Sequence, residues 1–312
     1  MWAAGALYFD LPIAWLRAPL ALTYGLAMLA VPFFIKGRWR ALGVVAAGFA
    51  VVLVWWFTIK PSNEGNWQPD VAQLAWAEIN GDEVTLHNVR NNEYRTETDY
   101  TARWETRTVH VSHITGVDLA INYWGSPWMA HPIASFQFAD APPICFSIET
   151  RKQVGQTYSA LGGLYRQFEL IYVVADERDV IRVRTNYRQG EDIYLYRTTM
   201  TPAQARERFH EYVRSLNEIR DHPRWYDAIT TNCTTSIRDQ HPIADRIPWD
   251  WRLLLNGKGD ELMFARHTIV TGGLRFPELK ARSQINARAK AADAMSNFSE
   301  LIRVGLPTFE MR

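Results

Sequence analysis

One short run of residues indicates nucleophilic chemistry. Cys233 lies in the run Thr-Thr-Asn-Cys-Thr-Thr-Ser at 230–236, and it is one of only two cysteines in 312 residues. So many hydroxyl groups are unfavourable in a core, because each would need a hydrogen-bond partner. The preceding threonines are good N-cap residues, which would put the thiol in the first turn of a helix. Free N–H groups and the helix dipole stabilise a thiolate there. The run therefore predicts a nucleophile, and a buried, inert cysteine is the alternative.

A thiol nucleophile needs a base, and histidine is the usual one. Of the eight histidines in the chain, His131 has the most suitable setting, because it begins a predicted strand at 131–138. Alternation along that strand puts His131 and Ser135 on the same face. The pattern predicts His131 as the base, and a structural histidine at a strand end is the alternative.

A carboxylate is expected beside that histidine. Residues 144–150 form a second short apolar–polar segment after a turn at 139–143, so the two segments are predicted to form a β-hairpin. If the chain turns at Asp140, Glu149 lies opposite His131, and Ser147 shares their face. A carboxylate there could hold the imidazole tautomer and stabilise the imidazolium. A slip of one residue would reverse the face, and an ion pair of Glu149 with Arg151 or Lys152 is the alternative.

The remaining pattern predicts an α+β fold in which helices flank a twisted antiparallel sheet. A lead-in hairpin is expected over 76–95 around Asn80-Gly81, and a helix is expected from Thr201-Pro202 to about residue 220. A last helix is predicted over 283–303. The acidic residues of 176–179 read as a solvated turn, and the arginines of 178–188 as one solvated strand face. Further strands are predicted at 102–110, 117–123, 165–175, 180–185 and 193–199.

The first 60 residues predict a membrane hairpin with spans at about 18–35 and 41–59. Both stretches are uncharged, and the loop between them, 36–40, carries three cations. The positive-inside rule keeps such a loop in the cytoplasm, so everything after residue 60 would lie on the outer side. Residues 1–17 read as an interfacial lead-in, and a cleaved signal peptide is disfavoured because the start has no basic region. The expected organisation is a membrane hairpin at 1–60, a linker and lead-in hairpin at 61–100, and a periplasmic thiol-enzyme domain at 101–312.

Composition and motifs exclude several functions. A net charge of +1 argues against a nucleic-acid partner. The sequence has no His-Glu-x-x-His, no Cys-x-x-Cys and no phosphate-binding glycine loop, so neither a metal nor another cofactor is expected. Two cysteines do not make a disulfide framework.

Four segments resemble a known family of bacterial envelope proteins, the Lnb-type lipoprotein N-acyltransferases, in their N-terminal periplasmic domain. These segments are 117–124 (VDLAINYW), 130–136 (AHPIASF), 168–173 (FELIYV) and 230–235 (TTNCTT), and the resemblance covers about 103–303. It implies a permuted papain-like (NlpC-type) thiol fold on the periplasmic side of the bacterial inner membrane. The histidine strand would then precede the cysteine helix, as His131 precedes Cys233. In this chain the two helices precede the domain, whereas membrane helices are expected after it in some relatives.

The resemblance also implies an activity, the ping-pong transfer of an acyl chain from a phospholipid-type donor to the α-amino group of a lipoprotein's N-terminal cysteine. Cys233 would be the nucleophile and His131 the base. Asn232 and Thr234 would help to form the oxyanion site, and Ser135 is a further positioning candidate. Two alternatives remain: a periplasmic amidase or peptidase that acts on the cell wall with the same Cys-His pair, and a non-catalytic, membrane-anchored assembly module.

Overall fold

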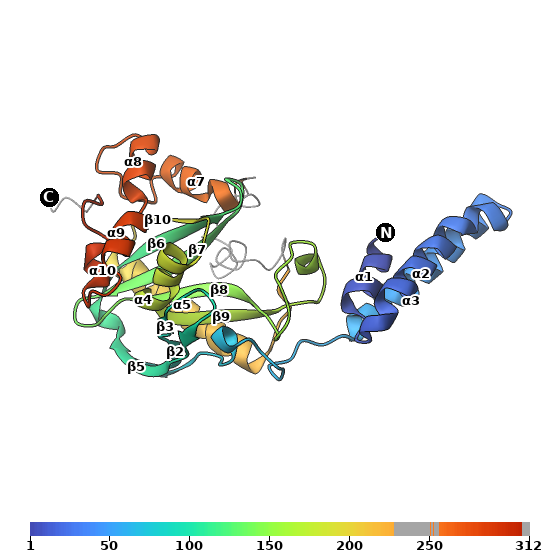
Figure 1. Cartoon of the computed structure of the whole chain (residues 1–312), viewed down its shortest axis with the longest axis horizontal. Helices are drawn as coiled ribbons and strands as arrows, with labels where there is room; N and C mark the ends of the chain where they lie inside the picture. The colour runs from blue at the N-terminus through green and yellow to red at the C-terminus, as the bar shows by residue number, and fades with distance from the viewer. Residues whose placement is uncertain (228–249, 251, 253–255, 308–312) are drawn as a thin grey trace. The chain divides into compact units, whose positions relative to one another are not determined.

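The chain is an α+β protein with a mixed sheet and two long apolar helices at its N-terminus (Figure 1). The computed structural model describes residues 1–227, 250, 252 and 256–307. The chain divides into two compact units, and each is described by itself. Unit 1 comprises 1–66, 150–170 and 223–231, and unit 2 comprises 67–149, 171–222 and 232–312.

Three helices begin unit 1: α1 (Trp2–Asp10), α2 (Ala14–Phe34) and α3 (Arg38–Thr58). Helices α2 and α3 have 21 residues each and are apolar enough to cross a membrane by length and composition. At 1.5 Å per residue each is about 30 Å long, which matches a bilayer core. They coincide with the spans predicted from the sequence, and α1 accounts for much of the expected lead-in.

Eight strands form one sheet in the order β1-β2-β9-β8-β7-β6-β10, with β5 also paired to β2. The predicted hairpin at Asn80-Gly81 is present as β1 and β2, and it belongs to this same sheet. The expectation of an antiparallel sheet is wrong at one place, because β2 and β9 pair in parallel at Arg90 and Ala175. A parallel pair needs a long crossover connection, and the 78 residues between these strands (91–168) supply one. The strands are β1 (Trp76–Asn80), β2 (Glu83–Arg90), β5 (Trp104–His110), β6 (Ile114–Trp124), β7 (Ala130–Phe138), β8 (Ile144–Arg151), β9 (Glu169–Asp176) and β10 (Glu191–Arg197), with a separate pair β3 (Glu93–Tyr94) and β4 (Tyr100–Thr101).

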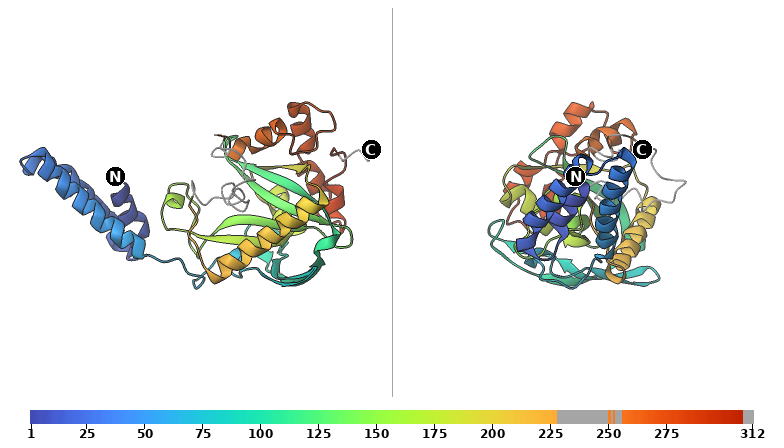
Figure 2. Two further views of the ribbon diagram at one scale, coloured as in Figure 1. Left: turned by 180° about the vertical axis from the view of Figure 1, so that it is seen from behind. Right: turned by 90° about the vertical axis from the view of Figure 1, so that its right-hand side faces the viewer.

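Helix α5 (Pro202–Asp221) covers one face of the sheet (Figures 1 and 2). It begins as predicted, with Thr201 as N-cap in a capping box with Gln204. Its Phe209 ring packs edge-on against Phe136 of β7 and Phe146 of β8, at 5.2 and 5.7 Å between ring centroids. Large side chains that are fully buried in this way each contribute about 1.5–3 kcal/mol.

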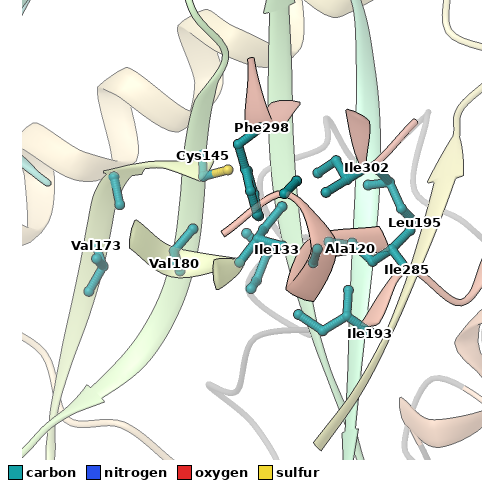
Figure 3. Packing of buried hydrophobic residues seen from close by; sticks show 14 of the residues in the cluster. Ala120, Ile133, Cys145, Val173, Val180, Ile193, Leu195, Ile285, Phe298 and Ile302 are labelled. Atoms are coloured by element: carbon teal, nitrogen blue, oxygen red, sulfur yellow. The ribbon is translucent and has the colours of Figure 1, made fainter. Parts of the chain in front are cut away.

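Short helices cover the opposite face. Ile133 of β7 and Cys145 of β8 belong to a buried cluster there with Val180, Phe298 and Ile302 (Figure 3). The sheet is therefore buried on both faces, and α5 and this cluster form its two cores. The short helices and turns of the chain are α4 (Glu177–Val180), η4 (Val183–Tyr187), α7 (Gly259–Ala265), α8 (Phe276–Ser283), α9 (Asn286–Ala291), α10 (Phe298–Leu301), η1 (Pro69–Val71), η2 (Val111–His113), η3 (Gly162–Leu164) and η7 (Asn256–Lys258).

Two predicted elements are corrected by the structure. Residues 180–185 are helical rather than a strand, because Asp176 caps a helix by accepting a hydrogen bond from the Arg178 N–H at 2.8 Å. Residues 283–303 hold two short helices, α9 and α10, rather than one long helix. The apolar residues that face the core there are Ile285, Ala289, Ala292, Phe298 and Ile302, whereas Met295 is exposed.

Candidate active site in the β7–β8 hairpin

The β7–β8 hairpin brings His131 and Glu149 together. Its register pairs Ile133 with Ser147 and Ser135 with Cys145. Continued by two residues, that register sets His131 opposite Glu149, as expected for a turn at Asp140. The imidazole Nε2 lies 3.9 Å from Glu149 Oε1, and the two side chains are 13% and 17% exposed.

Ser147 bridges the two side chains. Its Oγ lies 2.7 Å from His131 Nε2 and 2.6 Å from Glu149 Oε1. An ionised carboxylate can only accept, so the single hydroxyl hydrogen of Ser147 is donated to Glu149. His131 Nε2–H must then donate to Ser147, and the Nδ1 atom carries the lone pair of the neutral ring. The hairpin thus fixes one tautomer, in which Nδ1 can take up a proton.

Arg184 is the cation that accompanies Glu149. Its Nη2 donates to Glu149 Oε1 at 2.7 Å, in place of the neighbouring Arg151 or Lys152 that the sequence offered. Burial acts to raise the pKa of Glu149, but Arg184, His131 and Arg90 hold it well below its ordinary value. The carboxylate therefore stays ionised at every pH at which the protein would work.

The pKa of His131 is lowered to about 4. Burial is the largest cause, Glu149 opposes the shift, and the positive charges of Arg184 and Arg188 add to it. The imidazole is neutral at pH 7 as a result. We call His131, Ser147, Glu149 and Arg184 the histidine cluster.

A second buried ion pair lies close to this cluster. The Nε of Arg90 donates to the two carboxylate oxygens of Asp179 at 2.9 and 3.1 Å, and its Nη2 lies 2.8 Å from Asp179 Oδ1. The Asn92 N–H also donates to Asp179, at 2.7 Å. Arg184 itself lies in η4, a π-turn, and its Nη1 donates to the Val180 carbonyl at 2.7 Å. Single π-turns are frequent at functional sites.

The sequence pattern predicts a solvated turn for Asp179 and a solvated strand face for Arg184, but both residues are buried. The signal that could have found them is the N-cap pattern of Asp176 followed by an acidic first turn.

Asn122 is another residue near the cluster to which the sequence gave no role. It lies directly opposite His131 on β6 and is almost fully buried. Its amide Nδ2 donates to Glu191 at 2.6 Å, whereas its Oδ1 has no hydrogen-bond partner among the residues that the structure describes. An acceptor of this kind could receive a donor from a bound molecule.

Ser135 is not brought to His131. It lies four residues along β7, or about 13 Å at ~3.3 Å per residue. Its hydroxyl donates to Glu177 and accepts from Gln137 at 2.9 Å. Arg303 joins Glu177 to Asp118, with Nη2 2.5 Å from Glu177 and Nε 2.8 Å from Asp118. We call Ser135, Glu177, Arg303 and Asp118 the serine cluster.

The two cysteines and the predicted oxyanion residues remain to be placed. Cys145 is fully buried, and burial raises the pKa of its thiol well above the ordinary value, which makes it unreactive. The predicted nucleophile Cys233 and the oxyanion candidates Asn232 and Thr234 lie outside the described residues. Within 1–227 and 256–307, no three His, Cys, Asp or Glu side chains are grouped so that they could hold a metal ion.

Comparison with known proteins identifies the family. Residues 100–257, half of the chain, match the family model described as the Lnb N-terminal periplasmic domain. The matched region contains the histidine cluster and the Cys233 run. No curated protein and no solved structure matches the chain significantly. The matched domain and the two apolar N-terminal helices together suggest a membrane protein with a periplasmic domain. The chain belongs to the family of the Lnb N-terminal periplasmic domain.

Proposed function

We propose that the chain is a lipoprotein N-acyltransferase that uses Cys233 as nucleophile and His131 as base. The observation that carries this proposal is the histidine cluster, a neutral and nearly buried imidazole whose tautomer is fixed by Ser147 and Glu149. It lies in the same matched region as the predicted thiol nucleophile. Because His131 precedes Cys233 in the chain, the pair also fits a permuted papain-like order.

The first half-reaction forms a thioester. His131 Nδ1 takes the proton of the Cys233 thiol, and the thiolate attacks the carbonyl carbon of the donor ester. Backbone N–H groups near Asn232 and Thr234 would stabilise the oxyanion. The ester C–O bond then breaks, and the imidazolium returns its proton to the leaving oxygen of the lyso-phospholipid. A thiolate beside the ring favours the imidazolium, so the two groups would titrate as a coupled pair.

The second half-reaction transfers the acyl group. His131 accepts a proton from the α-amino group of the lipoprotein's N-terminal cysteine, and the amine attacks the thioester carbonyl. The C–S bond breaks, an amide forms, and the proton passes to the departing Cys233 sulfur. The thiol is regenerated, and no metal or redox partner is required for the balance.

The helices α2 and α3 support a membrane location for this chemistry. We infer that they form a hairpin in the bacterial inner membrane, with residues 36–40 in the cytoplasm and the chain after residue 60 in the periplasm. Donor phospholipids and lipoprotein N-termini both occupy the outer leaflet of such a membrane, so the anchor would concentrate the enzyme where its substrates lie.

The direct test is mass spectrometry of lipoprotein N-terminal peptides from cells that carry the wild-type chain, Cys233→Ala or His131→Ala. N-acylated peptides are expected with the wild type and should be missing with both variants. Ser135→Ala serves as the control, because Ser135 belongs to the serine cluster. Unmodified peptides in the wild-type strain would overturn the proposal.

Two other outcomes would favour one of the alternative functions over acyl transfer. Release of free fatty acid or cell-wall peptide that depends on Cys233, without N-acylation, would favour a hydrolase that uses water as the acceptor. A cellular function that is indifferent to Cys233→Ala would favour a non-catalytic assembly module.

A further inference from the structure

A loop of unit 1 packs on α1 and α3. Tyr165, in the connection between β8 and β9, stacks on Phe9 at 4.8 Å and on Trp2 at 6.2 Å between ring centroids. It packs against the buried cluster of α1 and α3 that contains Ala6 and Val52. A Cβ at Gly5 would lie 2.0 Å from the Tyr165 hydroxyl, so this close approach needs a glycine in α1.

Two polar side chains fix the same loop to the helix ends. Arg166 donates to the carbonyl oxygens of Trp56 and Ile59 at 2.6 and 2.5 Å, and its guanidinium lies 3.8 Å from the Trp56 ring centroid. Gln167 donates to the Phe9 carbonyl at 2.5 Å and to Asp10 at 3.0 Å. Carbonyl groups at a helix C-terminus have no donor within the helix, so these contacts satisfy the ends of α1 and α3. The loop is therefore held beside the C-terminal ends of α1 and α3.

The exposed part of this loop is uncharged. Residues 153–165 contain no charged side chain, whereas Lys152 and Arg166 flank them. Leu161 is 65% exposed and Tyr158 is 39% exposed. An uncharged segment with an exposed leucine and a tyrosine, flanked by cations, is suited to the boundary between lipid and water.

We propose that residues 153–165 form an interfacial membrane loop, which lies in the headgroup layer of the bilayer that holds α2 and α3, with Leu161 as its apolar anchor. The inference rests on the membrane hairpin of the proposed function. Its occupant is the lipid surface itself, because the loop is tied to α1 and to the end of α3 that we place on the outer side of the membrane. It gives the chain a third attachment to the membrane besides the two spans.

The test uses the full chain with Cys233→Ala, in vesicles of phosphatidylcholine and phosphatidylglycerol. Leu161→Cys is labelled with the environment-sensitive dye NBD, and lipids that carry doxyl quenchers at shallow or deep positions report the depth of the dye. Leu26→Cys in α2 is the deep reference, and Glu64→Cys in the polar linker is the aqueous reference. Cys145 is fully buried and should not be labelled.

A blue-shifted emission at position 161, quenched mainly by shallow doxyl lipids, is the expected result. Adding Tyr165→Ala should shift the emission of that label back toward the aqueous value, because the loop loses its packing on α1. A label at 161 that behaves like the label at 64, while the label at 26 is quenched by deep doxyl lipids, would overturn the interfacial loop and leave the hairpin intact. Absence of deep quenching at 26 would overturn both the hairpin and the loop. Neither result depends on acyl transfer, which mass spectrometry decides separately.

Discussion

The histidine cluster and the serine cluster share strand β7 but differ in chemistry. Each contains buried carboxylate and arginine groups with a serine hydroxyl that donates to a carboxylate. In the serine cluster the hydrogen bonds and ion pairs join a hydroxyl, two carboxylates and a guanidinium. The histidine cluster also contains the imidazole of His131, which can gain and lose a proton. Buried charge alone therefore builds a scaffold, and the titratable ring makes one cluster a candidate for proton transfer.

Loss of Arg303 should have the largest effect, because this residue compensates two buried carboxylates, those of Asp118 and Glu177. Breaking a buried ion pair typically costs about 3–5 kcal/mol, so Arg303→Ala should unfold at a much lower temperature than the wild type. Thermal unfolding of the full chain in detergent measures this. The control is Arg275→Ala, which removes an exposed ion pair with Glu278 and should change little. Equal stability of the two variants would show that the serine cluster is not a scaffold.

His131→Ala should abolish acyl transfer without comparable unfolding. A general base contributes about 10²–10⁴-fold to a rate, and the initial rate of N-acylation of a lipopeptide is the measurement. His113→Ala is the matched control, since His113 is an exposed histidine bonded to Asp140. If both variants kept the wild-type rate, the histidine cluster would have only a structural role, like the serine cluster.

The protonation of His131 should follow its depressed pKa. In Cys233→Ala, NMR of the labelled imidazole is expected to show a neutral ring down to about pH 4, instead of a midpoint near the ordinary value of about 6.5. The sign for stability follows from the same shift. Between about pH 6.5 and 4 the unfolded chain binds a proton that the folded chain does not bind, so this group's contribution to stability is lost as the pH falls through that window. A midpoint near 6.5 would contradict the buried, cation-flanked site.

A pair of serine variants separates the clusters more finely. Ser147→Ala and Ser135→Ala each remove a buried hydroxyl, which should cost about 1–3 kcal/mol of stability. Only Ser147→Ala should also lower kcat, by about tenfold for one lost hydrogen bond of roughly 1.4 kcal/mol, because the His131 Nε2–H then loses its acceptor. Comparable kcat values in the two variants would show that Ser147 does not orient His131 for catalysis.

Cys145→Ala should have the smallest effect. Its thiol is buried and its pKa is raised, so the substitution should cost about 1 kcal/mol of stability and leave acyl transfer unchanged. The measurement is the rate of acyl transfer by the wild type and by Cys145→Ala, before and after treatment with a thiol-blocking reagent. The reagent should inactivate both proteins equally, because only Cys233 should react with it. Loss of activity in Cys145→Ala would contradict the proposal that Cys233 alone is the reactive cysteine.

Local rules explain the features that could be predicted from neighbouring residues. The register that sets His131 opposite Glu149 follows from side-chain alternation and a short turn, both of which are written in neighbouring residues. Helix α5 follows from its cap at Thr201, and α2 and α3 follow from the length of their apolar stretches.

The pairing of distant groups could not be predicted in this way and is known only from the folded chain. Arg184 reaches Glu149, the β2–β9 pair runs parallel, and the 150–170 segment packs on α1 and α3 within unit 1. Each of these depends on contacts between residues far apart in the chain, and local spacing carries no information about them. The arginines of 178–188 show the reason most clearly. Their alternation with other residues resembles a solvated strand, but the Asp176 cap starts a helix there, and a buried guanidinium is stable only where the fold supplies a carboxylate to pair with it.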